Sequence, residues 1–126
     1  MASLTTIDGT EFHFDPSALL AVADHAADSE EAVTTVYGLT AGWLKTKERA
    51  DGLLQRIGAS GTFAKLTRPD GSAVWVNCKV VSVVRPSTEE EDPAAHAVVS
   101  VGTLNQAVKE TTPQIAEAVN DRGGSL

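Results

Sequence analysis

The stretch Leu66-Thr67-Arg68-Pro69-Asp70-Gly71-Ser72, followed by Val74-Trp75-Val76, decides how this chain folds. An Asp-Gly pair between two apolar runs is typical of a tight β-hairpin, because glycine readily adopts the positive φ that such a turn requires. The same arrangement occurs earlier as Leu4-Thr5-Thr6-Ile7-Asp8-Gly9-Thr10, followed by Phe12 and Phe14. The two Asp-Gly pairs are 62 residues apart in a chain of 126 residues. The sequence therefore predicts two copies of one small unit.

The 62-residue offset continues along the whole chain without a gap. Residues 1–62 and 63–124 share 11 identities, which include Lys47-Glu48 aligned with Lys109-Glu110. We call residues 1–62 the first unit and residues 63–126 the second unit. The linker at 58–61 is too short to hold two domains apart, and sixty residues alone would be only marginally stable. We therefore expect the two units to pack as one compact globular domain, related by a pseudo-twofold axis.

Each unit is predicted to be α+β and mostly β: a β-meander of about four to five short strands closed by one C-terminal helix. Aliphatic runs at 19–22 and 33–39 predict further strands in the first unit, as do 80–84 and 98–101 in the second. The closing helices are predicted from apolar stripes at helical spacing. In the first unit Thr46 is the expected N-cap and Gly58 the end, and in the second unit Thr111 or Thr112 caps ahead of Pro113.

Composition excludes several classes of function. With 10 Lys and Arg against 17 Asp and Glu, the net charge is −7, and the clustered basic residues that bind a nucleic-acid backbone are absent. No run of 18 apolar residues predicts a membrane span, and the N-terminus lacks the pattern of a signal peptide. We expect no nucleic-acid or membrane partner, and a cytoplasmic location on synthesis. A single cysteine and three histidines predict no disulfide, metal or cofactor.

The residue pattern does not predict an enzyme. Cys78 ends an apolar strand, where a lone thiol is usually a buried filler. His13 alternates with the flanking phenylalanines, and its counterpart in the second unit is Trp75, which could serve as neither a base nor a metal ligand. His25 and His96 have no partner at a suitable spacing. Asp8 and Asp70 are explained by the turns that they form.

The apolar surplus indicates an interaction surface instead. Several predicted strands are apolar on both faces, whereas a strand with one face in water would alternate apolar and polar residues. Either the sister unit or a second chain must cover the extra face. Tryptophan is enriched at binding hot spots. The interface candidates are Trp43, Trp75, Val74, Val76, Val81 and Val83.

Each unit resembles the small flagellar and swarming-motility (FlbD-like) protein family, whose short relatives also occur in bacteriophage genomes. The resemblance is carried by residues 66–72, Val74-Trp75-Val76-Asn77, the run 80–84 and Val108-Lys109-Glu110 in the second unit. Leu4-Thr5, Asp8-Gly9, Phe12, Phe14, Asp15 and Lys47-Glu48 carry it in the first. That family is usually one unit of this size, and it carries no catalytic motif that could be transferred. The resemblance implies a small non-enzymatic bacterial or phage protein.

Two hypotheses follow from the sequence. The first is a non-catalytic structural protein that forms a symmetric homo-oligomer or joins a larger assembly, such as a capsid decoration protein in a bacteriophage virion. The second is a binding module that holds a nucleotide-like small molecule in a groove between the units. In the second hypothesis Trp43, His13 and Trp75 would supply stacking surfaces.

Overall fold

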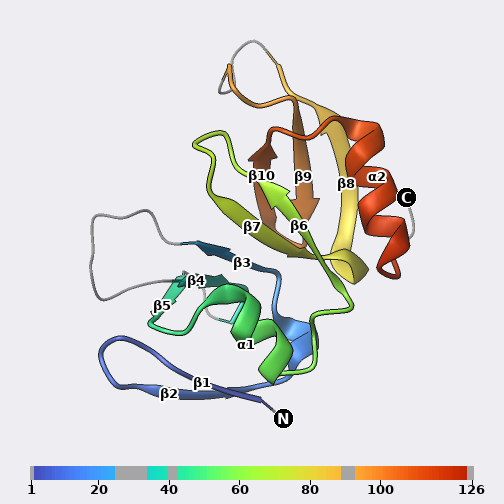
Figure 1. Ribbon diagram of the computed structural model, residues 1–126. Helices are drawn as coiled ribbons and strands as arrows, with labels where there is room; N and C mark the ends of the chain where they lie inside the picture. Colours follow the sequence, from blue (N-terminus) through green and yellow to red (C-terminus); the bar gives the residue numbers. More distant parts are fainter. Residues whose placement is uncertain (1, 25–33, 40–42, 89–92, 125–126) are drawn as a thin grey trace.

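The computed structural model describes residues 2–24, 34–39, 43–88 and 93–124, and it is α+β and mostly strand (Figure 1). The first unit contains β1 (Ala2–Thr5), β2 (Glu11–Phe14), the 3-10 turn η1 (Pro16–Ala18), β3 (Ala21–Asp24), β4 (Thr34–Tyr37), β5 (Trp43–Thr46) and α1 (Ala50–Arg56). The second unit contains β6 (Phe63–Thr67), β7 (Ala73–Asn77), the 3-10 turn η2 (Cys78–Val80), β8 (Val81–Pro86), β9 (Ala97–Val101), β10 (Leu104–Val108) and α2 (Thr112–Asp121).

The order of elements in the second unit repeats the order in the first. Each element of the second unit begins within two residues of the position that a 62-residue shift gives it. Both predicted hairpins are present, with β1 antiparallel to β2 and β6 antiparallel to β7. Gly9 and Gly71 turn these hairpins at φ values of 88° and 91°, which only glycine adopts without strain.

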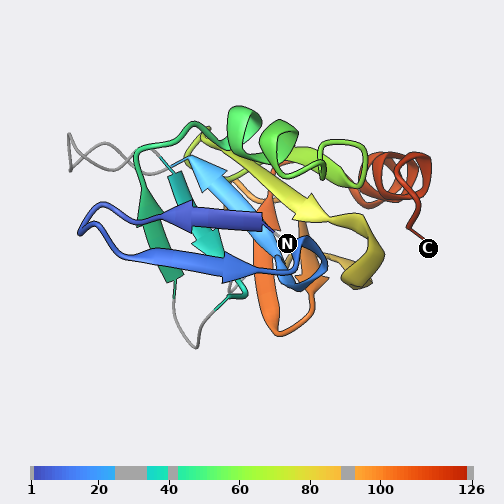
Figure 2. The ribbon, with the colours of Figure 1, turned by 90° about the horizontal axis from the view of Figure 1, so that it is seen from below.

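Each unit is a hairpin packed on a three-stranded meander, which differs from the single continuous meander that we expected. In the first unit β3, β4 and β5 pair in sequence order, and in the second β8, β9 and β10 do the same. The β1–β2 hairpin has no ladder to β3; it lies across β3 and β4 in Figure 2. Leu4 and Phe14 of this hairpin are buried against Val22 and Val36. The hairpins therefore cover the meanders face to face.

A strand from each unit joins the two halves of the chain. β3 pairs antiparallel with β7, so that one sheet runs in the order β5-β4-β3-β7-β6 (Figure 1). Val22 of β3 faces the core of the first unit, whereas its neighbours Ala21 and Ala23 face the core of the second. All three side chains are fully buried. Neither face of β3 is exposed to water over Ala21–Ala23, which explains this apolar run, and the half-buried Asp24 ends the strand.

The expected twofold relation between the units is not confirmed. A twofold axis that exchanges the units would turn the β3–β7 pair into a matching pair between β8 and β2. Both strands lie in the described part of the chain, and they do not pair there. The contact between the units therefore uses different strands from each side.

The closing helices follow the predicted apolar stripes. Leu53 and Leu54 of α1 are buried, as are Ile115 and Val119 of α2. The predicted cap at Thr46 is wrong, because Thr46 ends β5 and its hydroxyl donates to the Thr5 carbonyl at 3.0 Å. Arg49 occupies the N-cap position of α1. Thr111 is the N-cap of α2, and its backbone N–H donates to Gln114 Oε1 at 2.9 Å.

The hairpin aspartates make stability depend on pH in the acidic range. The Ser72 hydroxyl and backbone N–H donate to Asp70 and hold the pKa of that carboxyl below its ordinary 3.8. A carboxylate whose pKa is lower in the folded state stabilises the fold above the unfolded pKa. That contribution is lost as the pH falls through the folded pKa.

We expect Asp70→Asn to reduce this pH dependence, because the amide oxygen can still accept from Ser72 but cannot titrate. Urea unfolding midpoints measured at about pH 7, 5 and 3 test this. The variant and the parent should have similar midpoints at pH 7, and the parent should lose more of its midpoint between pH 5 and 3. Equal losses would exclude Asp70 as a source of the pH dependence.

Candidate functional site

The six interface candidates divide into buried and exposed residues. Val74, Val76 and Val81 are buried within the chain, so they cannot contact a partner, and the sister unit covers the extra face of β7. Of the two covers that the sequence left open for these three residues, the structure supplies one within the chain. Trp43 and Val83 are 62% and 49% exposed. Trp43 lies at the start of the outer strand β5, and Val83 lies on the outer strand β8.

Trp75 is half-buried at the contact between the units. It packs against the core cluster of the first unit and lines a cavity of about 380 Å³ together with Leu54 of α1. Lys65 Nζ lies 5.6 Å from the centroid of the Trp75 ring, within the range of a cation–π contact. Trp75 thus acts as an anchor within the chain.

The three side chains predicted to stack on a nucleotide-like ligand are Trp43, His13 and Trp75. The cavity beside Trp75 includes neither Trp43 nor His13. His13 lies on β2 with Nε2 3.3 Å from the carboxylate of Glu11, and its side chain is 61% exposed. None of the cavities of about 610, 510, 380 and 250 Å³ that the described residues line brings these three aromatic side chains together.

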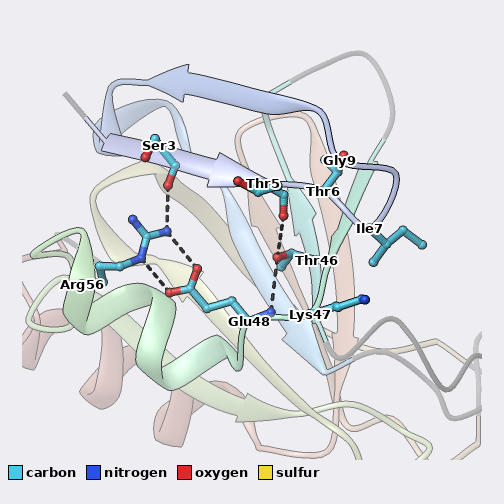
Figure 3. Close-up of a pocket in the computed structure, with 9 residues that line it drawn as sticks. All are labelled: Ser3, Thr5, Thr6, Ile7, Gly9, Thr46, Lys47, Glu48 and Arg56. Atoms are coloured by element: carbon cyan, nitrogen blue, oxygen red, sulfur yellow. Dashed lines mark hydrogen bonds and ion pairs between the residues drawn. The ribbon is translucent and has the colours of Figure 1, made fainter.

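A polar cleft of about 610 Å³ lies between β1, the end of β5 and α1 (Figure 3). Its walls carry threonine hydroxyls and two basic groups, and Lys47 points away from the Arg56–Glu48 ion pair. The lining residues are Ser3, Thr5, Thr6, Ile7, Gly9, Thr46, Lys47, Glu48 and Arg56. This cleft could not be predicted from the sequence, because its residues come from three separate segments.

The ion pair between Arg56 and Glu48 holds parts of the fold together beside Ser3 (Figure 3). Arg56 Nε and Nη2 donate to the two carboxylate oxygens of Glu48 at 2.7 and 2.9 Å. Arg56 Nη2 also donates to the Ser3 carbonyl at 2.7 Å. Hydrogen bonding to Glu48 raises the pKa of the Arg56 guanidinium above its ordinary value. The Arg56 charge is therefore already compensated by Glu48, and the pair fastens β1 to α1.

The described residues do not assemble a nucleophile with a base. Cys78 is buried, its Sγ–H donates to the Val76 carbonyl at 3.7 Å, and burial raises the pKa of its thiol. His13 has a different partner, Glu11. A grouping of three or more histidine, cysteine or carboxylate side chains suited to a metal is also absent from the described part of the chain.

An apolar groove runs between β8 and the first turns of α2. It is a shallow, open depression of about 510 Å³, lined by Ser82, Val83, Val84, Thr112, Pro113 and Ala116. We call it the β8–α2 groove. β8 is the last strand of the order β10-β9-β8, so one of its edges has no strand beside it in the described chain. Val83 was an interface candidate from the sequence, whereas the open edge and the helix wall were not.

Comparisons of this chain with protein-family models, curated proteins and solved structures found no match. Within the described residues, neither helix has the length and apolar character needed to cross a membrane.

Proposed function

We propose that this chain is a non-catalytic structural protein that assembles with copies of itself. The β8–α2 groove carries the proposal, because it is an apolar surface beside an unpaired strand edge. The corresponding surface of the first unit is covered: Asp51 and Leu54 of α1 line the cavity that Trp75 of the second unit enters. The surface beside α1 in the first unit is therefore occupied by the second unit, whereas the β8–α2 groove of the second unit stays open in the described chain.

Trp43 supports the proposal at a second position. Its side chain is 62% exposed, and it lies on β5 at the far end of the five-stranded sheet from β6. A chain with contact surfaces on two different sheets can bind more than one neighbour, as an extended or closed assembly requires. We further propose a pseudo-symmetric relation between the two units, supported by the repeated order of elements.

The most concrete form of this function is a component of a bacteriophage virion, such as a capsid decoration protein. The support is the resemblance of each unit to the FlbD-like family with its phage-encoded relatives, together with the lack of an assembled reactive site in the described residues. In this form the protein is made in the cytoplasm and acts as part of a larger particle.

The mass of the purified protein in solution tests the proposal. We expect light scattering behind a sizing column to give a discrete multiple of 13.2 kDa. Trp43→Ala should weaken the assembly about tenfold or more, since an interfacial tryptophan commonly contributes about 2 kcal/mol. Asn105→Ala, at the corresponding position of β10, is the matched control and should leave the mass unchanged. A parent mass of 13.2 kDa at every concentration would contradict the proposal.

A further inference from the structure

The contact between the two units can be carried over, residue by residue, to a contact between two chains. Within the chain β3 of the first unit pairs with β7 of the second through three residue pairs. These are Ala21 with Val76, Val22 with Trp75, and Ala23 with Val74. The 62-residue shift moves β3 onto β8 and β7 onto β2. The corresponding pairs are therefore Val83 with Phe14, Val84 with His13, and Arg85 with Phe12.

The two strands named by this shift are both open in the described chain. β2 pairs only with β1, and β8 pairs only with β9. An unpaired strand edge is a template for pairing with another chain. One molecule therefore has two open strand edges, β2 and β8, which correspond to the strands β7 and β3 that pair within the chain.

The side chains of β2 and β8 face the directions that this contact needs. Phe14 and Leu4 face the core of their own unit, as Val76 and Leu66 do in the second unit. Val84 packs toward the core of the second unit, as its counterpart Val22 packs toward the core of the first. Val83 of β8 is exposed, whereas its counterpart in β3, Ala21, is fully buried by the contact between the units.

We propose that β2 of a second copy of this chain pairs antiparallel with β8, in the register Val83–Phe14, Val84–His13 and Arg85–Phe12. His13 of that copy then enters the β8–α2 groove, as Trp75 enters the space beside α1 within the chain. This inference rests on the proposed function, and it names the surface and the partner. We choose a second copy as the occupant because the β6–β7 hairpin already fills the corresponding site beside β3 and α1 within the chain, and the β1–β2 hairpin is its counterpart.

The backbone of both edges suits the pairing. Thr6 N donates to Thr10 O in the first hairpin, so the alternate residues Glu11 and His13 direct their backbone groups outward. Ser87 N donates to His96 O. The alternate residues Val84 and Pro86 of β8 therefore also direct their backbone groups outward, away from β9. Pro86 has no N–H and would end the new ladder beyond residue 85. The internal ladder of β3 also ends at the corresponding residue, Ala23.

The contact between copies should be weaker than the one inside the chain. Asn77 Nδ2 donates to the buried Leu19 carbonyl at 2.9 Å, and Asn77 N donates to Leu20 O at 2.9 Å. The residue that corresponds to Asn77 is Asp15, whose carboxylate cannot donate. Arg85 also replaces the small Ala23. The assembly should therefore dissociate on dilution while each chain stays folded.

Because β2 and β8 are different surfaces, the contact is head-to-tail, and a mixing experiment can test it. Val84→Pro removes an outward N–H from β8, and His13→Pro removes one from β2, without breaking the ladders to β9 and β1. Both variants carry Trp43→Ala as well, which removes the other proposed contact, and we then expect each variant alone to be a monomer. An equimolar mixture should form a dimer of twice 13.2 kDa and nothing larger, because one β2 and one β8 remain usable.

Circular dichroism and urea midpoints check that both variants fold, and Val83→Glu with His13→Glu are milder substitutes. If the parent assembles and both variants assemble equally well, the β2–β8 contact is overturned and the proposed function stands. Variants that are monomeric alone and stay monomeric when mixed would overturn the head-to-tail arrangement. A parent that is monomeric throughout would overturn both the contact and the proposed function.

Discussion

Ala23→Arg is expected to unfold the entire chain. Ala23 is fully buried and faces the core of the second unit from β3, a strand of the first. An arginine there would place a large unpaired charge among apolar side chains, which is among the most destabilising changes a core can undergo. We expect a loss of about 4 kcal/mol or more, which is a large fraction of the stability of about 5–15 kcal/mol of a typical domain.

Arg85→Ala is the matched control for this prediction. Residue 85 corresponds to residue 23 under the 62-residue shift, but Arg85 lies exposed on the open strand β8. Removing it should change the free energy of unfolding by about 0.5 kcal/mol or less. Urea unfolding followed by circular dichroism and by tryptophan fluorescence measures both variants. A stable Ala23→Arg chain would mean that β3 does not lie between the two cores.

Asn77→Ala should produce the second largest loss. Asn77 is 3% exposed, and besides its bond to Leu19 O it accepts the Lys79 backbone N–H on Oδ1 at 3.1 Å. Alanine would leave a buried carbonyl of the first unit without a partner and would uncap η2. Such a loss typically costs about 1–3 kcal/mol. The urea midpoint should fall while the slope of the transition stays the same.

Asp15→Ala provides the comparison at the corresponding position of the first unit. Asp15 also caps a 3-10 turn, accepting the Ser17 N–H at 3.0 Å and the Ser17 hydroxyl at 2.9 Å. It is exposed and makes no bond of the kind that joins Asn77 to Leu19. Its removal should cost less than the removal of Asn77. Equal losses would show that the cap, and not the bond between the units, accounts for the effect of Asn77.

The local structure of each unit followed from the sequence because its signals are short-range. The Asp-Gly turns, the apolar stripes of the helices and the 62-residue repeat all depend on neighbouring residues or on one constant offset. The outer strands β5 and β10 were not located individually. Their sequences Trp-Leu-Lys-Thr and Leu-Asn-Gln-Ala-Val lack a regular alternation of apolar and polar residues.

The contact between the units could not be derived in the same way. Apolar residues on both faces of a strand predict that something covers them, but they do not distinguish a sister unit from a second chain. This is why Val74 and Val76 were grouped with Val83. A finer signal lies in the comparison of β3 with β8: Ala23-Asp24 in the first unit is replaced by Arg85-Pro86 in the second. Arginine and an edge proline are typical of a strand beside water.

The position of β3 also affects how the protein is made. Val22 leaves the ribosome more than fifty residues before its partner Trp75. At a synthesis rate of about 5–20 residues per second, β3 therefore waits for about 3–10 s with one edge and one apolar face uncovered. During this interval a nascent chain on the same messenger RNA could supply the missing hairpin. The shared strand thus makes the order and speed of translation part of how each chain finds its own second half.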